Sequence, residues 1–240
     1  MTIAGKAILI TGANRGIGRA LVAEALKRGA RRVYAASRQP VTSFDERVRA
    51  LTLDVTDPRQ IQAAAEAVES LDILINNAGV AQYDDLSDRA AIERHLAVNL
   101  FGPLGTIRAF TPALTKSHGS IVNVLSTTSL LAFAAIPSYS ISKAAAFSMS
   151  QSMRALLAGR VNVHVVMPGP VDTDMTRSID IPKASPESVA EAIFDGVERG
   201  QEEIFPDSQS AVLEESWSKG VFKVAERENA MIVAGMAVAS

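Results

Sequence analysis

Short apolar runs alternate along this chain with longer segments in which apolar residues recur at helical spacing. The runs are too short for helices and are typical of strands buried on both faces. They predict strands at residues 7–10, 33–36, 48–53, 72–76, 120–125, 161–167 and 203–205. The helical spacing predicts helices over residues 16–28, from residue 57 onward, over about 99–116, over 139–158 and from 185 to about 200.

This alternation predicts one α/β domain over residues 1–240. Strands that alternate with helices of about 10–15 residues imply right-handed crossovers, and therefore a parallel sheet covered on both faces. We expect a single-domain, doubly wound, Rossmann-like parallel sheet of about seven strands with helices on both faces. Ligands of such sheets bind beyond the carboxyl ends of the strands.

The composition suits a globular enzyme and excludes several other classes. The chain is 48% hydrophobic and 21% charged, and no linker interrupts its pattern. Its formal net charge of −2 argues against a nucleic-acid partner, which would require a basic excess. Cysteine is absent, which excludes disulfides and thiolate chemistry. His95, His118 and His164 lack ligand spacing, so we interpret them as surface or packing residues and expect no metal site.

The start of the chain has no signal-peptide pattern, and no apolar run reaches the ~18 residues of a membrane span. We therefore expect a cytoplasmic protein without a membrane partner. The longest apolar run, residues 230–239, is too apolar to be left in water. It is expected either to pack on a neighbouring subunit or to cover its own core.

A glycine-rich turn, Thr11-Gly-Ala-Asn-Arg-Gly-Ile-Gly18, lies between the first predicted strand and the first helix. Glycines there permit a tight turn and a close approach of the backbone to a pyrophosphate at the helix N-terminus. The spacing is G-x-x-x-G-x-G, not the G-x-G-x-x-G of the usual dinucleotide fingerprint. We predict nucleotide binding by this turn, with packing alone as the alternative.

The second predicted strand ends in Ser37 and Arg38, where a site for NAD would place an acidic residue on the ribose 2′-hydroxyl. Arg38 and Arg15 of the glycine turn are instead suited to a 2′-phosphate, so we expect NADP(H) as the cofactor. The alternative is that both arginines are solvated. Asp54 ends the third strand and is interpreted either as an acceptor for an adenine amino group or as a helix cap.

Tyr139 and Lys143 lie on one face of a predicted helix, and Ser126 ends the fifth strand. A free tyrosine has a pKa of about 10. An opposite charge within ~4–6 Å lowers the pKa of an acid by roughly 1–3, so Lys143 and an oxidised nicotinamide would bring this pKa toward neutrality. This predicts general acid–base catalysis by Tyr139 with Ser126 donating to a carbonyl oxygen, and hence hydride transfer.

The chain resembles the short-chain dehydrogenase/reductase family over nearly its whole length. The resemblance rests on TGANRGIG at 11–18, Asp54, NNAG at 76–79, Asn99, Ser126, YSISK at 139–143, and Pro168-Gly169 followed by Thr173. It implies that Tyr139 is the catalytic acid/base and that Ser126 contacts the substrate oxygen. It further implies that Lys143 binds the ribose and lowers the pKa of the tyrosine, and that Asn99 holds a proton-relay water.

The motifs and the resemblance together predict the cofactor site. Its members are Gly12, Asn14, Arg15, Gly16, Ile17, Gly18, Ser37, Arg38, Asp54, Val55, Asn77, Ala78, Gly79, Tyr139, Lys143, Pro168, Gly169, Val171 and Thr173.

The residues that flank these motifs predict the substrate pocket. They are Thr128, Phe133, Pro137, Pro170 and the segment 175–183, which begins with Met175. Most of them are apolar and no arginine cluster is present, so we expect an uncharged, lipophilic ketone, aldehyde or secondary alcohol. The long connection 172–186 is expected to act as a lid.

The resemblance also implies a dimer interface built from the helices at about 99–116 and 139–158, and we expect a homodimer or a homotetramer. The predicted function is that of an NADPH-dependent carbonyl reductase. An NAD(H)-dependent alcohol dehydrogenase is one alternative, and the missing acidic residue after the second strand counts against it. A nucleotide sensor without activity is the other, and the complete Ser–Tyr–Lys set counts against it.

Overall fold

The computed structural model describes residues 1–39, 41–43, 45–178 and 180–238 of the chain, with side chains described through Met231. Seven strands form one sheet: β1 (Ala7–Thr11), β2 (Arg32–Ser37), β3 (Val48–Thr52), β4 (Ile73–Asn76), β5 (Ser120–Val124), β6 (Asn162–Val166) and β7 (Glu203–Ile204).

The sheet is parallel throughout, with the strand order β3-β2-β1-β4-β5-β6-β7. From β1 the chain moves outward to β2 and β3, and then returns to place β4 on the other side of β1. The loops that leave β1 and β4 therefore diverge, and a crevice opens between them at the carboxyl ends of the strands. The predicted doubly wound sheet is confirmed.

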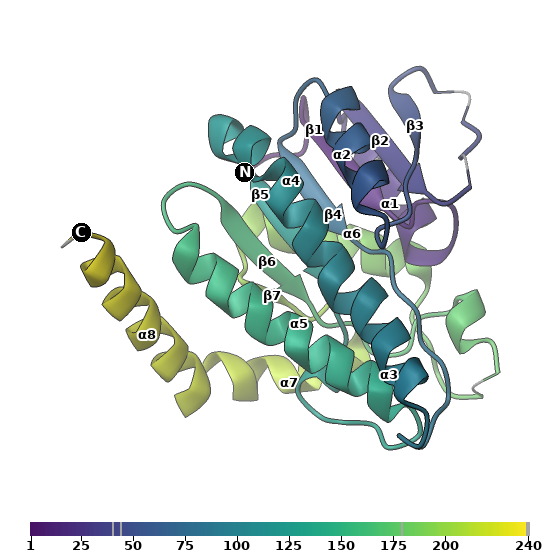
Figure 1. Ribbon diagram of the computed structural model, residues 1–240, viewed down its shortest axis with the longest axis vertical. Helices are drawn as coiled ribbons and strands as arrows, with labels where there is room; N and C mark the ends of the chain where they lie inside the picture. Colours follow the sequence, from purple (N-terminus) through teal and green to yellow (C-terminus); the bar gives the residue numbers. More distant parts are fainter. Residues whose placement is uncertain (40, 44, 179, 239–240) are drawn as a thin grey trace.

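The helices are α1 (Gly16–Lys27), α2 (Pro58–Ala67), α3 (Arg89–Leu96), α4 (Gly102–Ser117), α5 (Pro137–Leu156), α6 (Pro186–Arg199), α7 (Ser208–Ser218) and α8 (Val221–Val238). A π-helical turn (Ala97–Phe101) joins α3 to α4, and short 3₁₀ turns occur at Thr127–Ser129 and Asp174–Thr176. Helices α1 and α6 cover one face of the sheet, whereas α2, α4 and α5 cover the other (Figure 1).

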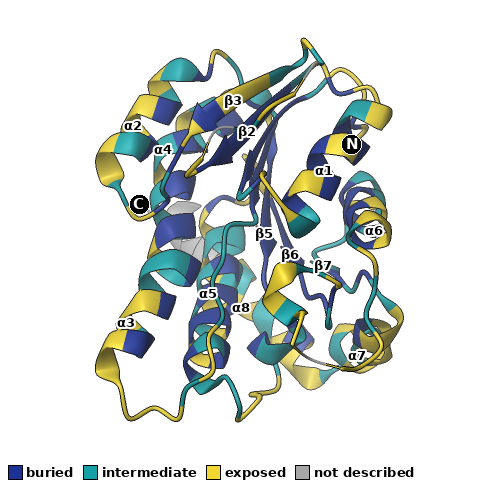
Figure 2. Cartoon of the chain, turned by 90° about the vertical axis from the view of Figure 1, so that its right-hand side faces the viewer, coloured by how far each residue is buried: buried dark blue, intermediate teal, exposed yellow. Residues whose placement is uncertain are grey.

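Each face of the sheet has its own core because successive strand residues point to opposite faces. Ile8 and Ile10 of β1 pack with Phe194 of α6, whereas Leu9 packs with Phe110 of α4. Figure 2 shows the buried residues concentrated along the sheet and on the inner sides of the helices. Each fully buried aliphatic or aromatic side chain contributes about 1.5–3 kcal/mol to folding.

The predicted strands and helices occur within a few residues of their expected positions. Helix α5 begins at Pro137, two residues before the expected start, because proline is well tolerated in the first turn of a helix. Helices α3, α7 and α8 were not predicted. The apolar run 230–239 falls at the end of α8, and its side chains from position 232 onward lie outside the described residues, so both expected arrangements stay open. Among the described helices, none combines the length and apolarity needed to cross a bilayer.

Candidate active site

A cavity of about 990 Å³ opens at the carboxyl ends of the central strands. It is lined by every residue predicted for the cofactor site, by Ser126, and by Thr128, Phe133, Pro170 and Met175 of the predicted substrate pocket. Asn99 and Pro137 are not among its lining residues, nor is Lys183. Position 179 of the predicted pocket segment lies outside the described residues.

The glycine turn is held between β1 and β4 by a compact set of hydrogen bonds. The hydroxyl oxygen of Thr11 accepts from the main-chain N–H groups of Asn77 and Ala78, both at 3.0 Å. The Asn77 amide in turn donates to the Thr11 carbonyl oxygen at 2.9 Å. A Cβ atom at position 18 would lie 2.1 Å from the Gly12 carbonyl oxygen, so only glycine permits this contact between turn and helix.

The N-terminus of α1 faces the cavity, since Gly16, Ile17 and Gly18 all line it. No side chain among the described residues caps this helix end. Its free N–H groups and positive dipole end are suited to a phosphate or pyrophosphate. The turn therefore fits the dinucleotide predicted for it.

The two arginines expected at a 2′-phosphate have different surroundings. Arg38 is exposed at the cavity rim, and no ion pair joins it to a described residue. Arg15 instead pairs with Asp174 at 3.3 Å, and Asp174 also contacts Arg177. In this arrangement Arg15 is paired with a carboxylate of the 172–186 segment, and the convergence of both arginines on one anion stays a prediction.

Asp54 does not cap a helix. The cap of α2 is Asp57, whose side chain accepts from the Arg59 N–H at 2.9 Å. Asp54 forms a local turn by accepting from the N–H and the hydroxyl of Thr56, at 2.9 and 2.7 Å. Helix capping is thereby excluded; Asp54 lines the cavity, and its role as an acceptor for an adenine amino group stays a prediction.

The predicted catalytic side chains meet in the cavity from two elements. Tyr139 and Lys143 project from the first turns of α5, and Ser126 follows β5. The Lys143 ammonium donates to the Val124 carbonyl oxygen at 2.9 Å and lies 5.6 Å from the centre of the Tyr139 ring. Ser126 accepts from the Thr128 N–H at 3.1 Å, so its own hydroxyl hydrogen is available to a ligand oxygen.

In the chain itself, burial dominates the pKa values of both Tyr139 and Lys143. Burial raises the pKa of Tyr139 to about 12, although the Ser126 hydroxyl acts in the other direction. Burial also lowers the pKa of Lys143 to about 8. The expectation combined the charge of Lys143 with that of an oxidised nicotinamide, and their joint effect on the phenol stays a prediction; in the chain itself, desolvation is the larger influence. At pH 7 the chain therefore presents a protonated phenol beside a mostly protonated lysine.

Asn99 lies in the π-helical turn, and its side chain is fully engaged. The amide nitrogen donates to the Val80 carbonyl oxygen and to the Ser142 hydroxyl, each at 2.9 Å, while the amide oxygen accepts from the Val80 N–H at 3.0 Å. Asn99 thus joins the segment after β4 to α5. In this arrangement its side chain positions other groups and has no free N–H for a water.

The substrate side of the cavity has an apolar rim. Tyr83, Phe133, Met175 and Ile181 all line it and are exposed by between 44% and 64%. Among the described residues the Thr128 hydroxyl finds no hydrogen-bond partner although it is buried, which makes it a polar anchor within this wall. Ile181 belongs to the predicted pocket segment 175–183, whereas Tyr83 carries no motif and the sequence offered no signal for it.

The sequence also gave no signal for the contacts that hold the start of α5. The Asp84 carboxylate accepts from the Ser138 hydroxyl at 2.7 Å and from the Ser138 N–H at 3.3 Å. Asp84 thereby caps α5 immediately before Tyr139. The N-cap residue of α5, Ile136, offers no polar side chain for this purpose. His95 is buried against the Tyr139 ring, which confirms its interpretation as a packing residue.

Comparison with known proteins agrees with this geometry. Residues 6–183 match the family model described as short chain dehydrogenase. The chain is 33% identical over 193 residues to the 3-oxoacyl-[acyl-carrier-protein] reductase FabG of Escherichia coli (strain K12), covering 75% of this chain and 79% of that protein. It is 30% identical over 246 residues to the 11-beta-hydroxysteroid dehydrogenase-like 2 of Arabidopsis thaliana, covering 92% and 77%.

Among solved structures, a short chain dehydrogenase from Burkholderia cenocepacia J2315 in complex with NADP superposes with a TM-score of 0.87 at 35% identity. The match covers 95% of this chain and 98% of that one. The similarity therefore includes the whole sheet and both helical layers.

Proposed function

The chain belongs to the short-chain dehydrogenase family, and on that basis we propose that it is an NADPH-dependent carbonyl reductase acting on an uncharged ketone or aldehyde. One observation carries the proposal: Ser126, Tyr139 and Lys143 share a single cavity with the glycine turn and the open N-terminus of α1. A proton donor, an oxygen ligand and a phosphate site are thereby combined in the arrangement that hydride transfer requires.

The residues of this chain divide the work on the carbonyl oxygen. NADPH, when bound, supplies the hydride to the carbonyl carbon. The Ser126 hydroxyl donates a hydrogen bond to the oxygen on which negative charge develops. Tyr139 transfers its phenolic proton to that oxygen, and its raised pKa keeps this proton in place at neutral pH. A protonated phenol is the form needed for reduction, which is the proposed direction.

NADP(H) is supported over NAD(H) by the end of β2 and by the relative in complex with NADP. Ser37 and Arg38 line the cavity where an acidic residue would bind an unphosphorylated ribose. Arg15 becomes available to a phosphate when its ion pair with Asp174 opens, and both partners are largely exposed, so this costs little. Lys143 is proposed to bind the ribose, and Asn99 to hold a proton-relay water.

We propose a lipophilic substrate without a charged group. The rim formed by Tyr83, Phe133, Met175 and Ile181 offers apolar contacts and no cation for a carboxylate or phosphate. The relatives described above are, by their names, a 3-oxoacyl-[acyl-carrier-protein] reductase and an 11-beta-hydroxysteroid dehydrogenase-like protein, and both names place an oxo or hydroxy group at the reacting position.

A homodimer or homotetramer is part of the proposal. Along α5, Ile141, Ala144, Ser148, Ser152 and Leu156 form an exposed stripe. The three small residues at its centre would let a second helix approach closely, with apolar contacts at each end.

The test is cofactor oxidation by the purified protein with NADPH and NADH in parallel, against a panel of aryl and alkyl ketones and aldehydes. Turnover that favours NADPH supports the proposal. Turnover of alcohols with NAD⁺ in preference would favour the dehydrogenase alternative. Tight NADPH binding without turnover of any carbonyl would favour the sensor.

A further inference from the structure

A carboxylate outside the catalytic set holds the loop that follows β6. The main-chain N–H of Gly169 donates to Oδ2 of Asp207 at 2.9 Å. Oδ1 of the same carboxylate caps α7 by accepting from the N–H groups of Gln209 and Ser210, at 3.0 and 2.9 Å. Oδ1 therefore caps the helix, while Oδ2 accepts from Gly169, which lies 38 positions away in the sequence.

The contact is tight at position 169. A Cβ atom there would lie 3.0 Å from Oδ1 of Asp207 and 3.3 Å from the Cβ of Gln209. A second bond ties the same helix end to the segment beside the cavity, since the Gln209 amide donates to the Pro182 carbonyl oxygen at 2.6 Å. The start of α7 thus contacts two segments at the cavity. One of them, residues 168–171, lines the cavity directly.

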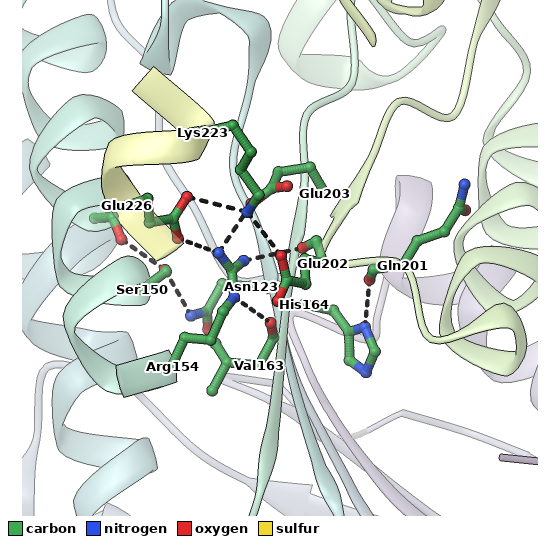
Figure 3. Close-up of polar contacts among 11 residues, drawn as sticks. Asn123, Ser150, Arg154, Val163, His164, Gln201, Glu202, Glu203, Lys223 and Glu226 are labelled. Atoms are coloured by element: carbon green, nitrogen blue, oxygen red, sulfur yellow. Dashed lines mark hydrogen bonds and ion pairs between the residues drawn. The ribbon is translucent and has the colours of Figure 1, made fainter. Parts of the chain in front are cut away.

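The far end of α7 is fixed by its own contacts. The Trp217 ring packs edge-on against Phe147 of α5, with ring centres 5.2 Å apart. Helix α8, which follows, is anchored by a cluster of buried charges, in which Lys223 reaches the carboxylates of Glu203 at 2.9 Å and Glu226 at 3.0 Å (Figure 3). Helix α7 is therefore held at both ends, and its N-terminus can act as a fixed support.

We propose that Asp207 is a positioning residue for the nicotinamide half of the cofactor. This inference rests on the proposed function and on the family resemblance, which implies that the stretch after Pro168-Gly169 contacts the nicotinamide. By accepting from the Gly169 N–H, Asp207 fixes the orientation of the peptide between Pro168 and Gly169, and with it the loop surface that the ring meets. The adenine half binds at the glycine turn and at β2, on the other side of the sheet crevice, and does not depend on Asp207.

Asp207→Asn separates the two roles of the carboxylate. Asparagine caps helices as well as aspartate does, so Oδ1 keeps the cap of α7. The amide nitrogen then takes the place of Oδ2. It cannot accept from the Gly169 N–H, so this hydrogen bond is lost. Asp88→Asn is the matched control, because Asp88 caps α3 by accepting from the Ala90 N–H at 2.8 Å and contacts no residue of the cavity wall. Gly169→Ala disturbs the same contact from the opposite side.

Three measurements test the proposal: amide hydrogen exchange at Gly169 in the free protein, the Kd of NADPH, and the Kd of adenosine 2′,5′-bisphosphate, which lacks the nicotinamide half. For Asp207→Asn and Gly169→Ala we expect NADPH to bind about tenfold more weakly and adenosine 2′,5′-bisphosphate to bind as before. For Asp207→Asn we also expect exchange at Gly169 to be at least about tenfold faster. Asp88→Asn should change none of the three.

Equal weakening of both ligands would show a general structural effect and overturn the proposal. So would unchanged NADPH binding, or unchanged exchange at Gly169, in Asp207→Asn. Failure of the unaltered protein to bind NADPH contradicts the proposed function itself. Normal NADPH binding by the unaltered protein, combined with no effect in either variant, contradicts the role of Asp207 alone.

Discussion

The Lys143 ammonium lies 5.6 Å from the centre of the Tyr139 ring and donates its hydrogen bond to the chain at Val124, not to the phenol. The two side chains are thus neighbours on one helix turn without a direct bond. Burial raises the pKa of Tyr139 to about 12 and lowers the pKa of Lys143 to about 8. Near pH 8, therefore, Lys143 changes its charge while Tyr139 stays protonated.

Tyr139→Phe should lower kcat by about 10²–10⁴-fold, because it removes the general acid and leaves the ring in place. NADPH binding should remain nearly intact, since the phosphate site and Lys143 are unchanged. Stopped-flow turnover and NADPH fluorescence titration measure the two quantities. Turnover equal to that of the unaltered protein would sink the assignment of Tyr139.

The kcat/KM for NADPH should fall as the pH rises through about 8. This parameter reports groups of the free enzyme, and Lys143, with its pKa lowered to about 8, loses its charge there. Tyr139 remains protonated over the same range because its pKa is raised to about 12. In Lys143→Met the remaining activity should lack this limb. A limb of the same position and slope in that variant would exclude Lys143 as its source.

The same shift has a consequence for folding with a definite sign. Between about pH 8 and the ordinary lysine pKa of 10.5, Lys143 is neutral in the folded chain and charged in the unfolded chain. The unfolded state then binds more protons, so the free energy of unfolding contributed by this residue rises with pH. Comparing urea unfolding of the unaltered protein with Lys143→Met across this window isolates the contribution.

Much of the fold and the core of the site could be predicted because their signals are local. Apolar runs identified the strands, and the glycine turn and the Tyr139–Lys143 spacing identified the site through short-range geometry. The Asp84–Ser138 and Asp207–Gly169 contacts could not be found this way. They join residues 54 and 38 positions apart through loops whose paths depend on the packed structure. The effect of burial on the pKa of Tyr139 could not be predicted either, because sequence spacing reveals a neighbouring charge but does not reveal the depth of burial.

Arg38→Asp should shift cofactor preference from NADPH toward NADH. An aspartate there repels the 2′-phosphate and can accept from a ribose 2′-hydroxyl. The ratio of kcat/KM values for NADPH and NADH measures the shift, and we expect it to fall by at least about tenfold for the loss of one charge-assisted contact. Arg59→Asp, at an exposed position of α2 outside the cavity, is the control. An unchanged ratio in Arg38→Asp would show that Arg38 does not contribute to cofactor preference.

Ile141→Glu combined with Leu156→Glu should reduce the assembly to monomers. Both side chains are exposed, at 43% and 57%, on the outer stripe of α5, and two carboxylates would be buried by a second helix placed there. Light scattering after size exclusion gives the mass directly. Val212→Glu, on the exposed side of α7, is the control for added charge. An assembly unaffected by the double substitution would move the interface away from α5.

Lys223→Met should destabilise the attachment of α8. The Lys223 side chain is 3% exposed and contacts Glu202, Glu203 and Glu226 at 2.8–3.0 Å. Arg154 also belongs to the cluster, since it contacts Glu203 at 2.9 Å and pairs with Glu226. Removing one partner of a buried ion pair leaves uncompensated charge and costs about 3–5 kcal/mol.

Lys219→Met is the matched control for this change. Lys219 pairs with Glu215 on the surface of the same region, where both side chains are more than three-quarters exposed. Such a pair one helix turn apart contributes about 0.3–0.5 kcal/mol. We expect urea unfolding to report the large loss only for Lys223→Met, and limited proteolysis to cleave first near α8, since that helix is held to β7 and α5 by this cluster.

Adding Glu203→Gln to Lys223→Met should recover part of the stability, because it removes one of the carboxylates left without a partner. Equal stability of the two single variants would show that the cluster is as weak as a surface pair and that α8 is held by its apolar contacts instead.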